Sequence, residues 1–135
     1  MIAQRQWPSE QTRRYVTEER SAHTVFVPMI ESVAAVEALD EICAIPGVHA
    51  LFVGPNDLTV NMGIPNQYDH PDLIAMLQRI IDTGNRHHVA AGCWFAKPEQ
   101  ALRTIRQGAR FVVFSNDGVM LQEAMAGAFG RLRRG

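Results

Sequence analysis

Short, continuously apolar segments alternate with amphipathic segments along most of this chain. The apolar segments occupy residues 24–30, 50–54, 89–95 and 110–116. Their length and lack of polar interruption are typical of strands that are buried on both faces. This order predicts an α/β fold, in which each strand of a parallel sheet is followed by a right-handed helical crossover.

Helices are predicted where apolar residues recur at spacings of three and four. In one segment Ser32 is a candidate N-cap, and in another Pro71 stands in the first turn and Gly84 near the end. A further helix precedes the first strand, so the order is one helix and then four strand–helix units. The predicted helices cover residues 9–20, 32–45, 71–88, 97–108 and 118–134.

Composition indicates one ordinary globular domain over residues 1–135, with residues 1–8 expected to be flexible. The net charge of −1 gives no overall attraction to nucleic acid or membranes. The first residues are polar and lack an apolar core, so we expect no signal peptide, and no apolar run approaches the ~20 residues of a membrane span. Cys43 and Cys93 lie in apolar segments, as reduced core residues do, so we expect a cytoplasmic protein.

Four strand–helix units can form a small open sheet or half of an eight-stranded barrel. The chain holds no second copy of the pattern, so it cannot close a barrel alone. In both architectures the chemistry is expected at the carboxyl ends of the strands. Glu31, Asp57, Trp94 and Asp117 fall at those ends.

Two of these residues are acids that follow neighbouring strands. Adjacent strand ends lie ~5 Å apart, so Glu31 and Asp57 could share one cation. Two carboxylates, with water or substrate oxygens at the other positions, suit Mg²⁺ or Mn²⁺. Alternatively, Glu31 is an acid favoured by a helix N-terminus and Asp57 is an N-cap.

The residues Gly54, Pro55 and Asn56 lead into Asp57 through the sequence GPND. Gly54 permits close backbone approach and Pro55 stiffens the loop. A helical turn beginning at Asp57 would point backbone amides outward, which suits an anion. A cation beside such amides matches a small 2-oxo acid, whereas an ordinary Pro-Asn turn is the alternative.

These motifs resemble a known family. The sequences PMIES, AVEALDEICAIPGVHALFVGPNDLTVNMG and AAGCWFAKPEQALRTIRQGARFVVFSNDGVML are similar to the metal-dependent pyruvate aldolases of the HpcH/HpaI (4-hydroxy-2-oxoheptanedioate aldolase) and citrate lyase β-subunit family. The resemblance covers the chain from about Arg14 onward and implies the C-terminal half of a TIM-type (β/α)₈ barrel. It also implies a carbon–carbon lyase that uses Mg²⁺ or Mn²⁺, with Co²⁺ as a further possibility, and cleaves a hydroxy-oxo acid to pyruvate and an aldehyde.

The resemblance assigns roles to individual residues. Glu31 and Asp57 would be the metal ligands, and the backbone around Asn56 and Asp57, after Gly54 and Pro55, would hold the substrate carboxylate. Met29 stands where many members carry a substrate-binding Gln, so that contact is altered here. Trp94 would line the pocket. Asp117 matches an acidic residue that is expected to cap a helix.

No catalytic residue is identified in this chain. In the family, a His acts as the base and an Arg stabilises the oxyanion. The resemblance implies that both belong to the first half of the barrel, which this chain lacks. We expect the five histidines to be surface or cap residues. They are His23, His49, His70, His87 and His88.

Three functions therefore stay open: an aldolase that is incomplete in this chain alone, an inactive metal- or oxo-acid-binding or assembly fragment, and a citrate lyase-like enzyme acting on coenzyme A thioesters. The sequence GPNDL favours the free-acid branch. Four exposed parallel strands leave two open edges, so we expect self-association or a complementary N-terminal half as partner.

Overall fold

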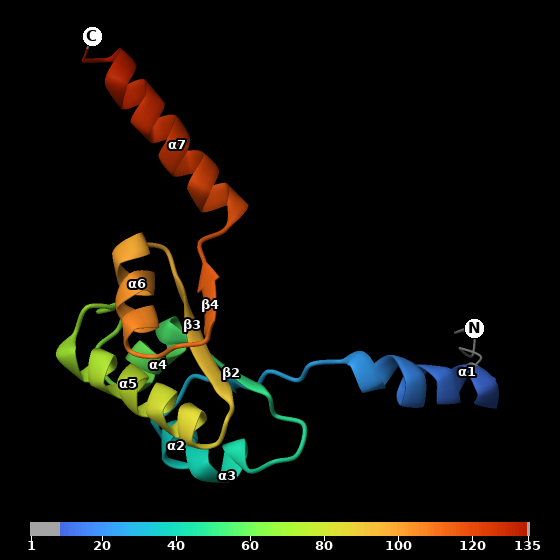
Figure 1. Cartoon of the computed structure of the whole chain (residues 1–135). Coiled ribbons are helices and arrows are strands. Elements are labelled where there is room, and N and C mark those ends of the chain that lie inside the picture. Colours follow the sequence, from blue (N-terminus) through green and yellow to red (C-terminus); the bar gives the residue numbers. More distant parts are fainter. Residues whose placement is uncertain (1–8, 135) are drawn as a thin grey trace, which may run out of the picture.

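The computed structural model describes residues 9–134 and contains one four-stranded sheet (Figure 1). Its strands are β1 (Met29–Ile30), β2 (Ala50–Val53), β3 (Ala90–Phe95) and β4 (Phe111–Phe114). They lie in the order β1-β2-β3-β4, and each neighbouring pair is parallel. Sequential order with parallel pairing confirms the predicted run of strand–helix units.

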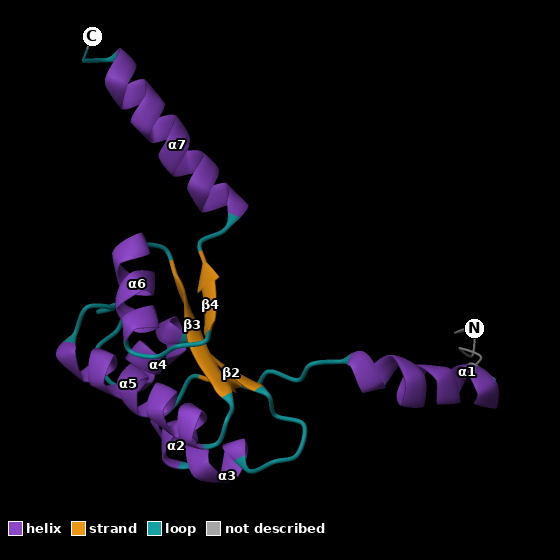
Figure 2. Cartoon of the chain, viewed as in Figure 1, coloured by secondary structure: helices purple, strands orange, loops and turns teal. Residues whose placement is uncertain are grey.

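The helices between the strands pack on one face of the sheet (Figure 2). Side chains on that face are buried, as at Ile30, Val53 and Cys93, whereas Met29 and Val113 on the opposite face are exposed. A doubly wound sheet is covered on both faces, and a barrel carries its helices only on the outside. The uncovered face therefore corresponds to a barrel interior. The covering helices are α2 (Val33–Glu37), α3 (Leu39–Cys43), α5 (Pro71–Arg86) and α6 (Pro98–Arg106).

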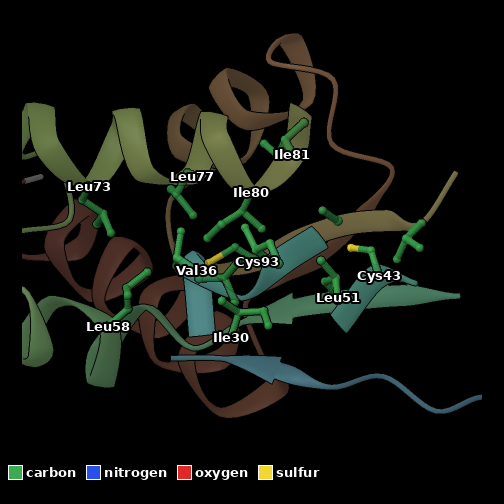
Figure 3. Close-up of a cluster of buried hydrophobic side chains, with 14 of the residues drawn as sticks. Ile30, Val36, Cys43, Leu51, Leu58, Leu73, Leu77, Ile80, Ile81 and Cys93 are labelled. Atoms are coloured by element: carbon green, nitrogen blue, oxygen red, sulfur yellow. The ribbon is translucent and has the colours of Figure 1, made fainter. Parts of the chain in front are cut away.

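The core lies between α5 and the sheet (Figure 3). Leu77 and Ile80 of α5 point toward Val36 and Cys93, and Leu73 points toward Leu58. Fully burying a side chain of this size stabilises the fold by about 1.5–3 kcal/mol. This packing holds β2 and β3 rigidly and so positions the residues that follow them.

The structure corrects three predicted boundaries. The first strand is limited to Met29–Ile30, with an isolated bridge from Phe26 to Val48, because Pro28 has no N–H to donate to a ladder. The helix predicted over 32–45 divides at Ala38, whose ψ of 11° departs from helical geometry. The turn predicted from Asp57 is a seven-residue helix, α4 (Pro55–Asn61).

Both ends of the described chain extend away from this body (Figure 1). The predicted first helix is divided into α1 (Glu10–Arg14), a π-helical turn η1 (Tyr15–Arg20) and a 3-10 turn η2 (Ser21–His23). The last helix, α7 (Asp117–Leu132), buries none of its residues. Within residues 9–134, no helix is long and apolar enough to cross a membrane. The expected flexibility of residues 1–8 concerns residues outside the described part.

Candidate metal and oxo-acid site

The register of the sheet brings the candidate site residues into one row. Ile30 pairs with Val53, and Val53 pairs with Cys93. The next residues along these strands are Glu31, Gly54 and Trp94. Neighbouring strands lie about 4.8 Å apart, so the row forms the rim at the carboxyl end of the sheet.

The side chains of Met29 and Glu31, from the neighbouring strand segment, pack against the backbone of Gly54. A methyl group added to its Cα would lie 3.2 Å from Glu31 Oε2 and 3.1 Å from Met29 Sδ. The Glu31 carboxylate therefore lies beside Gly54, at the start of the segment that carries Asp57. A larger residue at position 54 would crowd both side chains and force them to shift, so the glycine favours this close approach.

The helix α4 fixes Asp57. Gly54 is its N-cap and Pro55 its first residue, and Leu58 N–H donates to Gly54 O at 3.0 Å. Leu58 and Thr59 are fully buried and anchor this helix to the core. Asp57 lies in the first turn and is exposed. Glu31 thus lies beside Gly54, and Asp57 follows Gly54 by three residues in the first turn of α4.

A polar network that the sequence did not predict holds Asn56. The Tyr68 hydroxyl donates to Asn56 Oδ1 at 2.7 Å, and Thr59 Oγ1 donates to Asn56 O at 2.8 Å. Thr59 Oγ1 also accepts from the backbone N–H of Asn66 at 3.2 Å. This network could not be predicted from the sequence, because only the fold brings Tyr68 to Asn56.

The segment after Glu31 is fixed from both directions. Ser32 caps α2, as predicted, because its Oγ accepts from Ala35 N–H at 3.2 Å. Val33 N–H donates to Oδ1 of Asn61, the last residue of α4, at 2.8 Å. This bond joins the segment that carries Glu31 to the helix that carries Asp57.

Within the described residues, the carboxylates of Glu31 and Asp57 are not engaged by other side chains. Both side chains are exposed, and neither makes a hydrogen bond or ion pair within the described part of the chain. Among residues 9–134, no cluster of three or more His, Cys, Asp or Glu side chains could hold a metal ion. Carboxylates are hard oxygen donors, so these two side chains are chemically suited to Mg²⁺ or Mn²⁺ with other positions left to water or substrate.

Trp94 connects the row to the last strand. Its Nε1 donates to Ser115 O at 3.0 Å, directly after β4. Ser115 has a φ of 54° and a buried hydroxyl with no partner in the described structure, which is a strained position. The structure corrects the role expected of Asp117: Asn116 Oδ1 caps α7 through Val119 N–H at 2.9 Å, and Asp117 lies within the first turn.

The histidine side chains with described hydrogen bonds lie at the two ends of α5 and not in the row of Glu31, Gly54 and Trp94. His70 caps the N-terminus of α5 and His87 caps its C-terminus, where it is 2.7 Å from Asp40 Oδ1. None of the hydrogen bonds within residues 9–134 joins a histidine to Glu31 or Asp57. The buried thiol of Cys93 is also unsuited to act as a nucleophile, since burial raises its pKa to about 12. Within residues 9–134, no histidine is thus hydrogen-bonded to either carboxylate in a way that would make it a candidate base.

Comparison with known proteins identifies the family of the chain. A sequence model described as HpcH/HpaI aldolase/citrate lyase matches residues 3–124. The 2-keto-3-deoxy-L-rhamnonate aldolase of Escherichia coli K12 is 34% identical over 100 residues, which are 71% of this chain and 36% of that enzyme. The chain therefore spans about a third of this curated relative.

Two solved structures extend the comparison to the fold. An HpcH/HpaI aldolase/citrate lyase family protein from Burkholderia cenocepacia J2315 superimposes with a TM-score of 0.82 and 30% identity, over 90% of this chain and 47% of that one. An HpcH/HpaI aldolase from Desulfitobacterium hafniense DCB-2 gives 0.77 and 27%, over 94% and 49%. The four strands thus match about half of the TIM-barrel-like fold of these proteins. The chain belongs to the HpcH/HpaI aldolase/citrate lyase family.

Proposed function

We propose that this chain is the metal- and oxo-acid-binding half of a divalent-metal-dependent aldolase, which cleaves a hydroxy-oxo acid to pyruvate and an aldehyde. The observation that supports the proposal is the position of Glu31 beside Gly54, the N-cap of the helix whose first turn carries Asp57; neither carboxylate has a partner among the described residues. Membership of an aldolase/citrate lyase family and the identity to a 2-keto-3-deoxy sugar acid aldolase support this class of substrate.

Glu31 and Asp57 would hold the cation, Mg²⁺ or Mn²⁺. When bound, the cation supplies positive charge that favours the enolate form of a 2-oxo acid over the keto form. Asn56, fixed by Tyr68 and Thr59, keeps the start of α4 in place beside the bound acid. The half-buried Trp94 forms an apolar wall that excludes water from one side.

The reaction also needs a group to move a proton. Cleavage requires removal of the substrate hydroxyl proton, rupture of the carbon–carbon bond to release the aldehyde, and protonation of the enolate carbon to give pyruvate. No base lies beside the two carboxylates in the described residues. We therefore propose that this chain binds pyruvate and metal but turns over little or no substrate without a complementary half.

The first test measures metal binding directly. Free Mn²⁺ has an electron paramagnetic resonance signal that weakens when the ion is bound. Titration of the chain with Mn²⁺, with and without pyruvate, should show one site that pyruvate tightens. Glu31→Gln and Asp57→Asn should each weaken it at least about tenfold, because each removes one of two charged ligands.

A matched control is Asp117→Asn, which makes the same charge change at the end of β4, where the carboxylate instead accepts from Gly118 N–H at 2.8 Å. Equal weakening by Asp117→Asn would show nonspecific electrostatics and would overturn the site. Retro-aldol turnover by the isolated chain at a rate typical of an intact enzyme would overturn the view that it is incomplete.

A further inference from the structure

A second cavity lies on the helix-covered side of the strand ends. Its volume is about 670 Å³, within the usual range for small-molecule sites. The end of β3, residues 66–70 and the first turns of α5 and α6 surround it. Glu31, Asp57 and Met29 do not line it, whereas Pro55 and Trp94 do, so the cavity adjoins the candidate metal site without including the two carboxylates.

The floor of this cavity is apolar. Leu73, Leu77, Cys93 and Phe95 line it, and each is at most 7% exposed. A group in contact with this floor would be removed from water on most sides, which favours an aromatic or branched hydrocarbon body. The floor by itself supplies affinity with little selectivity.

The charges at the mouth favour one kind of ligand. Asp69 is already matched, because Arg103 NH2 lies 3.0 Å from its Oδ1 and Gln100 Nε2 lies 3.5 Å from the same atom. Lys97, the only lysine of the chain, also lines the cavity and makes no ion pair within residues 9–134. The hydrogen bond from Arg103 lowers the pKa of Asp69 most, and the charge of Lys97 lowers it further. Two cations thus face one carboxylate, and the mouth carries a net positive charge.

His70 and Tyr68 complete the wall. His70 Nδ1 accepts from Asp72 N–H at 3.2 Å, so its other ring nitrogen is the one available to a ligand. The Tyr68 hydroxyl is engaged with Asn56 and closes the side toward the carboxylate site. We propose that this cavity binds a small carboxylate with an aromatic or branched apolar body, with the body on the leucine floor and the carboxylate near Lys97.

Fluorescence of Trp94, which lines the cavity, can report binding. The substitution Trp7→Phe leaves Trp94 as the only tryptophan. The probes are 3-phenylpropionate and its neutral analogue 3-phenylpropan-1-ol, titrated with a chelator present so that no metal contributes. Both should give a saturable change, and the acid should bind more tightly.

Two substitutions test the two parts of the proposal. Lys97→Gln should weaken the acid about two- to fivefold, as expected for a solvent-exposed ion pair, and leave the alcohol unchanged. The matched control, Arg79→Gln, removes an exposed cation outside the cavity and should change neither. Ala96→Phe, at the half-buried edge of the lining, should abolish binding of both probes while circular dichroism shows an unchanged fold.

Three results would overturn the inference. They are no saturable binding of either probe at millimolar concentration, equal weakening of acid and alcohol by Lys97→Gln, and loss of binding in Glu31→Gln, which would place the probe at the carboxylate site. The inference does not rest on the proposed aldolase function. Mn²⁺ binding can fail while the probe binds, and the reverse, so the two failures are distinguishable.

Discussion

The chain contains two helices of the same length with opposite environments. Both α5 and α7 have 16 residues, begin with a capped N-terminus and end with basic residues. Six residues of α5 are buried, whereas none of α7 is. Helix length and capping are thus properties of the local sequence, but burial depends on what lies opposite.

The apolar residues of α7 indicate that it needs a partner. Leu121, Met125, Phe129 and Leu132 follow one another at spacings of four and three, and all are 49–76% exposed. Such a stripe is typical of a helix that packs on another surface. The helix follows β4, which is an edge strand, so the uncovered surface continues from the sheet into the helix.

The largest expected effect is the difference in the free energy of unfolding when one leucine is replaced by alanine in each helix. Leu73→Ala in α5 is expected to lower the free energy of unfolding by about 2–5 kcal/mol, because Leu73 is 1% exposed and leaves a void. Leu121→Ala in α7 should lower it by less than about 0.5 kcal/mol, because Leu121 is 63% exposed. Urea denaturation at low protein concentration measures both.

A loss above about 1 kcal/mol at Leu121 would contradict exposure of α7 and show that it is buried in solution. Repeating the titration at high protein concentration sharpens the comparison. If copies of the chain cover α7, the effect of Leu121→Ala should grow with concentration while that of Leu73→Ala changes little.

Self-association is the second expected effect. Sedimentation should show oligomers at micromolar concentration, because the sheet edges and the stripe of α7 are uncovered. The double substitution Met125→Glu and Phe129→Glu should shift the distribution toward monomer by about tenfold or more in dissociation constant.

The control for this experiment adds the same charges to another face of α7. Gly127 and Gly130 lie roughly opposite the stripe, and a methyl group added at Gly127 would contact nothing within 4 Å. Gly127→Glu with Gly130→Glu should therefore leave association unchanged. A wild-type chain that stays monomeric at micromolar concentration would show that the prediction is wrong.

Much of the fold follows from apolar periodicity. The four strands and the helix α5 were predictable, because continuous apolar runs and Leu73, Leu77 and Ile80 at helical spacing report burial directly. The truncation of β1 was harder to predict, since Val25 and Phe26 have strand-like character but are exposed, and Phe26 forms only an isolated bridge to Val48. Whether α7 packs could not be predicted, because a stripe indicates a need for a partner and not its presence.

For the candidate site, only its location at the strand ends could be predicted from the sequence. Glu31 and Asp57 follow apolar runs, so topology alone places them at one rim. Tyr68 and Asn66 come from a loop without periodicity, and their contacts to Asn56 and Thr59 depend on the path of that loop. The cavity above Leu73 and Leu77 was likewise unpredictable, because those leucines show the same pattern whether a void lies beside them or not.

The smallest expected effect concerns how each helix ends. At the C-terminus of α5, His87 Nε2 lies 2.7 Å and Arg86 NH2 3.3 Å from Asp40 Oδ1 in α3. At the end of α7, Arg131 and Arg133 make no ion pair in the described part of the chain. A polar contact between helices thus accompanies packing only in α5.

The hydrogen bond to His87, followed by the charges of Arg86 and His87, lowers the pKa of Asp40 below its ordinary value of 3.8. A carboxylate whose pKa is lower in the folded state stabilises the fold above its unfolded pKa, and this contribution is lost as the pH falls through the folded pKa. Thermal unfolding from pH 5 to pH 3 should therefore show a slightly smaller fall in Tm for Asp40→Asn than for the wild type. The difference should be no more than about 2 °C, because Asp40 is exposed and screened by solvent.

Asp117→Asn in α7 makes the same charge change without loss of an ion pair. If it matches the effect of Asp40→Asn, the pH dependence reflects net charge and not the contact between α3 and α5.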